Sequence, residues 1–96
     1  MNYYILNYIL EKNYLEERGK YRTEHLNLAK EAAQTGTVVL AGALDNPADE
    51  AVLIFRAENE EAAKTFAESD PYVKNGLVKE WSVRKWNVVI GNDVAN

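Results

Sequence analysis

The order of strand-like and helix-like segments constrains the fold of this 96-residue chain more than any other feature. Segments rich in aromatic and β-branched residues, 3–10, 37–44, 51–57 and 77–90, are separated by helical patterns over 19–34 and from about 59 to 70. The resulting order, β-α-β-β-α-β, is the ferredoxin-like pattern. Its right-handed crossovers place both helices on one face of an antiparallel sheet. We therefore predict an α+β fold with a four-stranded antiparallel sheet. We expect a single domain over residues 1–96, with its core in 3–90 and a flexible tail in 91–96.

The boundaries of the two predicted helices have recognisable signals. Gly36 supplies the left-handed position that ends the first helix. Asn59 can cap the second helix, and Asp70 ends it because a residue before proline avoids the helical region. Residues 11–18 are expected to form a polar connection. The first helix is expected to pack on the sheet through two adjacent rows of residues: Leu26, Ala29 and Ala33, and His25, Leu28 and Ala32.

The predicted strands are too apolar to leave one sheet face exposed to water. The first strand is mostly apolar on both faces, which is typical of a strand that is covered on both sides. In the last strand we expect Trp81 and Val83 on one face, with Val78 and Trp86 on the other. A monomer seldom exposes such a patch, so we predict a homodimer in which a second copy covers the open sheet face.

Composition excludes several classes of function. A net charge of -4 with scattered Lys and Arg argues against a nucleic-acid partner. The absence of cysteine removes thiolate nucleophiles and cysteine-based zinc sites. No apolar run approaches the roughly 20 residues that span a bilayer, and the first residues lack a basic signal-peptide region. We expect a cytoplasmic protein without a membrane partner.

His25 is the only histidine and the first candidate for a protonatable site. Arg22 precedes it by one helical turn, so both side chains can face one pocket. A single histidine cannot form a His-based metal site, and the acidic turn at 45–50 lacks the alternation of a calcium loop. We predict no metal and no cofactor. The alternatives are a structural histidine at a helix–sheet junction and an arginine on a solvated helix face. Tyr8, Tyr72 and Trp81 can line a pocket, although aromatic residues on strands more often form core or interface.

Two short motifs carry a resemblance that covers the chain from Tyr3 to about Val88. They are Arg22-x-x-His25 at the start of the first helix and Ser69-Asp70-Pro71-Tyr72 at the end of the second, with Gly36 and Gly42 between them. In this order and spacing the chain resembles the YCII-related family of small dimeric α+β-barrel proteins. The resemblance implies a pocket between helices and sheet with a catalytic pair, His25 and Asp70. It also implies a substrate-binding set of Arg22, Tyr72, Ser69 and Gly42, and isomerisation or elimination on small organic acids.

The chemistry of such a pair is proton transfer. A neutral imidazole accepts a proton near pH 7, and a carboxylate on its other nitrogen fixes the tautomer. Asp70 has the alternative interpretation of a turn residue before proline, and both roles are compatible. We hypothesise an enzyme in which His25 and Asp70 transfer a proton on a small organic acid that Arg22 anchors. The alternatives are a non-catalytic dimeric ligand-binding or assembly module and a pure dimerisation domain.

Overall fold

The computed structural model describes residues 1–91 and forms two layers, a sheet and a set of helices. The antiparallel sheet has the order β2-β3-β1-β4, with β1 at Asn2–Leu10, β2 at Val38–Ala43, β3 at Glu50–Ala57 and β4 at Val78–Trp86. The helices are α1 (Tyr14–Glu17), the 3-10 turn η1 (Arg18–Lys20), α2 (Arg22–Gln34), α3 (Glu61–Ser69) and α4 (Pro71–Lys74). The predicted ferredoxin-like α+β fold is confirmed.

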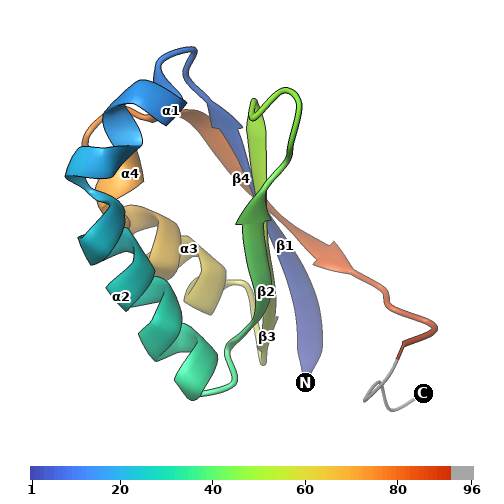
Figure 1. Cartoon of the computed structure of the whole chain (residues 1–96). Helices are drawn as coiled ribbons and strands as arrows, with labels where there is room; N and C mark the ends of the chain where they lie inside the picture. The colour runs from blue at the N-terminus through green and yellow to red at the C-terminus, as the bar shows by residue number, and fades with distance from the viewer. Residues whose placement is uncertain (92–96) are drawn as a thin grey trace.

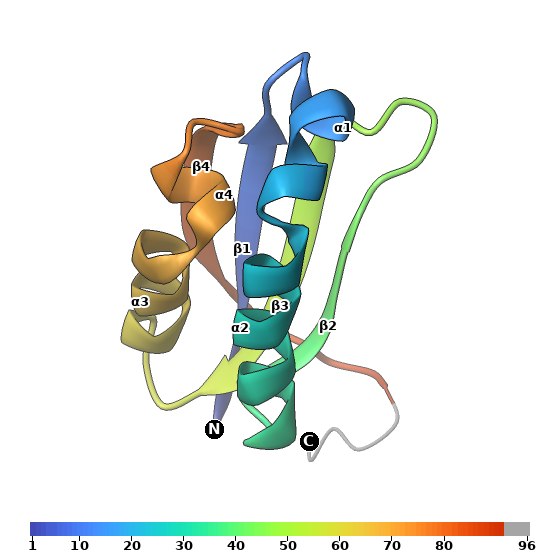
Figure 2. The ribbon, with the colours of Figure 1, turned by 60° about the vertical axis from the view of Figure 1, so that its left-hand side comes forward.

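Among residues 1–91, the helices all lie on one side of the sheet, and no helix covers the opposite face (Figure 1). Viewed from the helix side, α2 and α3 run side by side across the sheet (Figure 2). The core lies between these layers. On β1 the buried residues alternate with half-buried ones that face the open side. The helix-facing residues of β1 are Tyr4, Leu6, Tyr8 and Leu10.

The connection after β1 is more structured than predicted. Residues 11–18 contain α1 and the start of η1, and α2 begins at Arg22 rather than at Gly19. Within this mostly polar segment Tyr14 is buried. Its ring packs edge-to-face against Tyr72 at 5.7 Å between ring centroids. One aromatic contact thus folds this segment against the helix layer.

Strand β4 differs from the prediction in length and in the arrangement of its faces. It ends at Trp86, the last residue that pairs with β1, rather than at Ile90. The register shifts by one residue, so that Ile9 pairs with Glu80 and Leu10 with Val78. Because of this bulge, Val78 and Trp81 both pack against the core, and the expectation that they face opposite sides was wrong.

The predicted end of the first helix is confirmed by its hydrogen bonds. Gly36 has φ +79, its N–H donates to Ala33 O, and the N–H of Thr37 donates to Ala32 O. These bonds form a Schellman motif at the end of α2. At the start of α3 the N-cap is Glu60 rather than the predicted Asn59, although the side chain of Asn59 accepts a hydrogen bond from the N–H of Glu61.

The apolar stripe predicted for α2 is less buried than expected. No residue of α2 is fully buried, and Ala33 is exposed, so its placement in the stripe was wrong. The remaining stripe residues are half-buried. Helix α3 instead buries Ala63, Phe66 and Ala67. Space therefore remains between α2 and the sheet.

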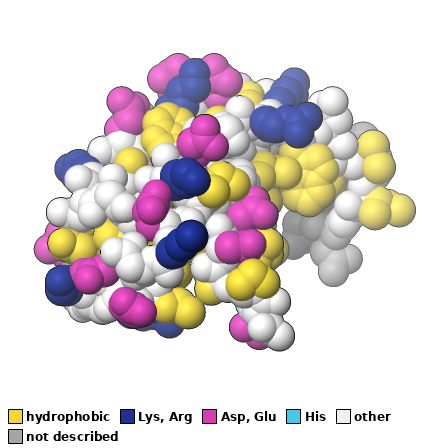
Figure 3. Space-filling model, turned by 90° about the horizontal axis from the view of Figure 1, so that it is seen from above, with side chains coloured by type: hydrophobic (Ala, Val, Ile, Leu, Met, Phe, Trp, Pro, Cys, Tyr) yellow, Lys and Arg dark blue, Asp and Glu magenta, His cyan; other side chains and the backbone are white. Residues whose placement is uncertain are grey.

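The predicted tail at 91–96 lies outside the described residues, apart from Gly91. Within residues 1–91, no helix is both long and apolar enough to cross a membrane. Seen from above, Lys and Arg side chains stand among Asp and Glu side chains rather than in a basic patch of their own (Figure 3).

Candidate active site

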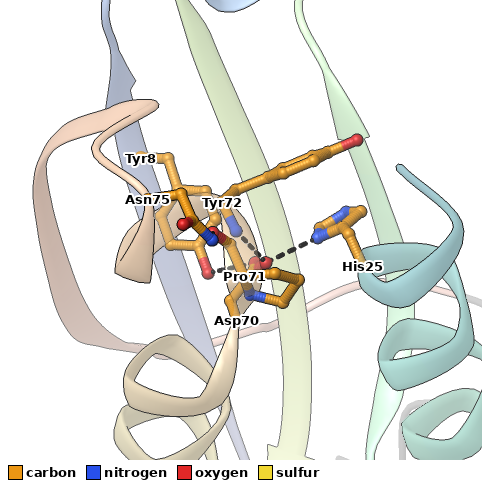
Figure 4. A network of polar contacts seen from close by, with 6 residues as sticks. All are labelled: Tyr8, His25, Asp70, Pro71, Tyr72 and Asn75. Carbon is orange, nitrogen blue, oxygen red and sulfur yellow. Dashed lines mark hydrogen bonds and ion pairs between the residues drawn. The ribbon is translucent and has the colours of Figure 1, made fainter. Parts of the chain in front are cut away.

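Asp70 is a fully buried carboxylate between α3 and α4, with a relative exposure of 0%. Three donors surround it (Figure 4): the Tyr8 hydroxyl at 2.7 Å from Oδ2, and the Tyr72 N–H at 3.0 Å and His25 Nδ1 at 2.8 Å from Oδ1. An ionised carboxylate only accepts hydrogen bonds, and three donors stabilise that charge in a buried position.

The backbone explains why Asp70 occupies this position. Pro71 forces the preceding residue into an extended conformation, and Asp70 has ψ 122. This ends α3, and Asp70 then caps α4 by accepting from the Tyr72 N–H. The turn role and the contact with His25 therefore coexist on one carboxylate, as the sequence allowed.

His25 reaches Asp70 from the first turn of α2. Because Asp70 accepts, the neutral imidazole has its proton on Nδ1, and Nε2 keeps a free lone pair. The ring stacks on Tyr72 at 3.9 Å between centroids, with an interplanar angle of 11°. Figure 4 shows its second nitrogen directed away from Asp70. Hydrogen bond and stacking together fix the orientation of the imidazole.

Tyr8 supplies the donor on the other side of Asp70. Its side chain comes from the middle of β1 and is 1% exposed. Burial raises the pKa of the Tyr8 hydroxyl well above its usual range, and the negative charge of Asp70 and the hydrogen bond to it act in the same direction. Tyr8 therefore stays protonated and remains a donor to Asp70.

A cavity of about 230 Å³ lies beside this network, under α2. One part of its wall is apolar: Leu10, Leu26, Ala29, Ala41, Ala43, Ala51 and Leu53. The remaining lining residues carry polar groups or expose backbone: Tyr8, Tyr14, Arg18, Arg22, His25, Gly42 and Tyr72. The alanines of β2 pair with Leu53 and Ala51 on β3, and their small side chains leave the space open. The volume is below the ~300–1,000 Å³ of drug-sized sites and suits one small molecule.

Two guanidinium groups and an unsatisfied hydroxyl border this cavity. Burial raises the pKa of Tyr72, while the positive charges of Arg22 and Arg18 partly offset that rise. The Tyr72 hydroxyl is buried without a hydrogen-bond partner among the described residues. Within residues 1–91 neither arginine forms an ion pair, although Arg18 lies over the Tyr14 ring at 5.6 Å. An oxyanion in the cavity would satisfy all three groups.

The structure brings five of the six predicted site residues to the cavity or its network and leaves one outside. His25, Arg22, Tyr72 and Gly42 line the cavity, with Asp70 behind them. Ser69 is exposed at the end of α3 and is not part of the lining. A Cβ at Gly42 would meet no atom within 4 Å, so nothing in the structure crowds this position.

Sequence reasoning missed three residues at this site. Tyr8 was considered only as a pocket-lining aromatic, and neither Arg18 nor Tyr14 was considered part of the site. The available signal was the closeness of Arg18 to Arg22 in the sequence.

Among residues 1–91, no cluster of three or more His, Asp or Glu side chains has the arrangement of a metal site.

Comparison with known proteins assigns the family. The model of the YCII-related domain matches residues 1–87, so the chain belongs to the YCII-related family. No curated protein sequence matches the chain significantly.

Solved structures with the same fold include enzymes. A 5-chloro-2-hydroxyhydroquinone dehydrochlorinase from Burkholderia phenoliruptrix AC1100, in complex with 2,5-dihydroxybenzoquinone, has a TM-score of 0.73 and 21% identity, over 88% of this chain and 92% of that chain. A candidate antibiotic biosynthesis monooxygenase from Bacteroides thetaiotaomicron has a TM-score of 0.59 and 16% identity, over 99% and 95%. A similar candidate from Deinococcus radiodurans has a TM-score of 0.57 and 11% identity, over 100% of both chains. At these identities the likeness establishes the fold.

Proposed function

We propose that this chain is a small-molecule enzyme in which His25, oriented by Asp70, transfers a proton on a small organic acid, with isomerase or lyase chemistry. One observation carries the proposal: the 2.8 Å contact between His25 Nδ1 and a fully buried Asp70, at the wall of a cavity. A carboxylate with that placement increases the basicity of Nε2 and stabilises the imidazolium that forms.

The reaction begins with abstraction of a proton from a carbon next to a carbonyl group. Nε2 of His25 takes this proton, and the electron pair of the broken C–H bond delocalises onto the carbonyl oxygen. In a lyase the pair then forms a double bond and expels a leaving group from the neighbouring carbon. In an isomerase the imidazolium returns the proton to a different carbon. Neither path requires a nucleophile.

The cations at the cavity define the class of substrate. Arg22 and Arg18 favour an anion, and the Tyr72 hydroxyl offers a hydrogen bond to an oxygen that gains charge during the reaction. The volume of about 230 Å³ suits a single ring or a short chain with a carboxylate or enolate group. The dehydrochlorinase with the same fold holds 2,5-dihydroxybenzoquinone, a ligand of this size class.

Proton exchange in D2O tests the chemistry without knowledge of the product. Pools of small enolisable acids are incubated with the protein, and loss of the C–H signal is followed by proton NMR. Exchange is expected with the parent, and with Lys30→Gln on the exposed part of α2 as a matched control. His25→Gln is expected to lower the rate at least ~100-fold, the scale of general-base catalysis. Arg22→Gln is expected mainly to raise the concentration of acid that gives half of the maximal exchange rate.

Two outcomes would redirect the assignment. Exchange that persists in His25→Gln would remove His25 as the base. Saturable binding of an acid without exchange would favour the alternative, a non-catalytic ligand-binding or assembly module. Binding is followed by the rise in melting temperature, since a ligand of the native state stabilises it.

We also propose that a second copy of the chain covers the open sheet face. The support is apolar exposure on that side: Leu40 on β2 is 70% exposed and Trp86 on β4 is 46% exposed. Sedimentation velocity should give a dimer at micromolar concentration, and Leu40→Lys should shift it toward monomer. A parent that sediments as a monomer would contradict this assembly.

A further inference from the structure

Tyr8 is a buried titratable residue to which the proposed proton transfer gives no role. Its hydroxyl donates to Oδ2 of Asp70 at 2.7 Å, while His25 Nδ1 lies 2.8 Å from Oδ1. Tyr8 and Asp70 are 1% and 0% exposed, so water does not compete for either oxygen. The carboxylate is thus held between a strand residue and a helix residue.

We propose that Tyr8 is a positioning residue that sets the basicity of His25 through Asp70. This rests on the proposed function in that it deepens the role of the same site. The property that it predicts, the titration of His25, needs no substrate.

The Tyr8 hydroxyl changes how the Asp70 carboxylate distributes its negative charge. A donor on Oδ2 disperses negative charge that would otherwise act on the imidazole, and it fixes the plane in which Oδ1 faces His25. Without this donor, a buried carboxylate with one bond fewer holds a proton more tightly. Because His25 and Asp70 titrate as a coupled pair, the pair binds its proton more tightly without the Tyr8 donor, whether the proton resides on His25 or on Asp70.

The consequence concerns the capacity of His25 to act as a base. With the Tyr8 hydroxyl present, the pair binds its proton less tightly than it would without that hydroxyl, which favours the unprotonated imidazole. Other groups also face His25: Tyr14 from α1, Arg18 from η1, Arg22 from α2 and Tyr72 from α4. They are unchanged in a Tyr8 variant, so a difference between parent and variant isolates the hydroxyl.

The test is the NMR titration of the His25 imidazole in the parent, in Tyr8→Phe and in Tyr4→Phe. The control residue lies on the same face of β1 and is also buried, but its hydroxyl accepts from Asn2 at 3.4 Å. With one histidine in the sequence, the signal needs no assignment. We expect the midpoint to rise by about one pH unit in Tyr8→Phe, a tenfold gain in proton affinity, and to stay unchanged in Tyr4→Phe.

A second measurement covers the case in which Tyr8→Phe does not fold. Site-specific replacement of Tyr8 by 3-fluorotyrosine makes the phenol a stronger donor, so the midpoint should fall. A midpoint that moves in neither variant, or equally in Tyr4→Phe, would overturn the proposal and leave Tyr8 as core packing. These results are independent of catalysis: a shifted midpoint with no proton exchange on any acid would retain Tyr8 and reject the proposed function.

Discussion

Helices α2 and α3 cover the same face of one sheet but pack on it very differently. In α3, Ala63, Phe66 and Ala67 are buried, and Phe66 meets Phe55 edge-to-face at 5.4 Å between ring centroids. In α2 no residue is fully buried. The difference shows a division of roles, in which α3 supplies packing energy and α2 borders the cavity.

The sheet beneath each helix explains the difference. Under α2 the edge strand β2 presents Ala41 and Ala43 to the cavity, whereas α3 packs against the large residues of the sheet centre. The hydrogen bond between His25 and Asp70 joins the two regions, because His25 comes from α2 and Asp70 from the end of α3.

The largest expected effect tests whether α3 holds most of the packing energy. Phe66→Ala removes a ring that is 5% exposed, and should lower the free energy of unfolding by about 3–5 kcal/mol. Leu28→Ala on half-buried α2 should lower it by about 1–2 kcal/mol, since less area leaves water. Urea denaturation gives both values. Equal losses would mean that the two helices contribute alike.

A smaller loss is expected when the link between the two regions is cut. Asp70→Asn removes the negative charge that accepts hydrogen bonds from His25 and Tyr8. The free energy of unfolding should fall by about 1.5–3 kcal/mol. Hydrogen exchange should then speed up more in α2 than in α3, because α2 loses its polar anchor. The control Asp49→Asn changes an exposed carboxylate and should stay within about 0.5 kcal/mol. Equal acceleration in both helices would show that α2 does not depend on this bond.

The tightly packed parts of the molecule were those that sequence patterns could predict. Helix α3 and its end at Asp70 follow from local signals: Asn59, which accepts from the first N–H of the helix, and the proline at 71. The strand order follows from right-handed connections between such elements. In these regions local preference and tertiary packing agree.

The region around the cavity was harder to predict because long-range contacts decide its structure. The pairing of His25 with Asp70 spans 45 positions and was named only through the family resemblance. Tyr8 meets Asp70 across 62 positions, which no local period encodes. Helix α1 lies where a polar connection was predicted, and its residue Tyr14 packs on Tyr72, which is distant in the sequence. Helix α2 is likewise only half-buried because small side chains of other elements, those of Ala41, Ala43 and Ala51, leave space beneath it.

Raising the pH from 10 to 11 should lower the contribution of Tyr8 to the free energy of unfolding by about 1 kcal/mol. Burial, first, and then the charge of Asp70 raise the pKa of Tyr8, so the folded protein keeps a proton that the unfolded chain loses above pH ~10. This contribution is fully present below that pH and falls as pH rises, by up to ~1.4 kcal/mol per pH unit. Tyr8→Phe should therefore lose about 1 kcal/mol less than the parent between pH 10 and 11. Urea denaturation at both pH values measures this, and Tyr4→Phe should follow the parent. Parallel slopes for all three proteins would contradict it.

The smallest effect on stability should accompany the largest effect on binding. Ala41 lies on the cavity wall but is exposed, so Ala41→Leu places new atoms in empty space and should change stability by less than about 0.5 kcal/mol. The same atoms occupy the volume that a ligand needs. An enolisable acid that raises the melting temperature of the parent, used as the probe, should therefore no longer raise it in Ala41→Leu. Val39→Leu on the same strand lies outside the cavity lining and should retain binding. If Ala41→Leu bound the probe as the parent does, the space under α2 would not be the binding site. If it strongly destabilised the protein, α2 would be packed far more tightly than its half-buried residues indicate.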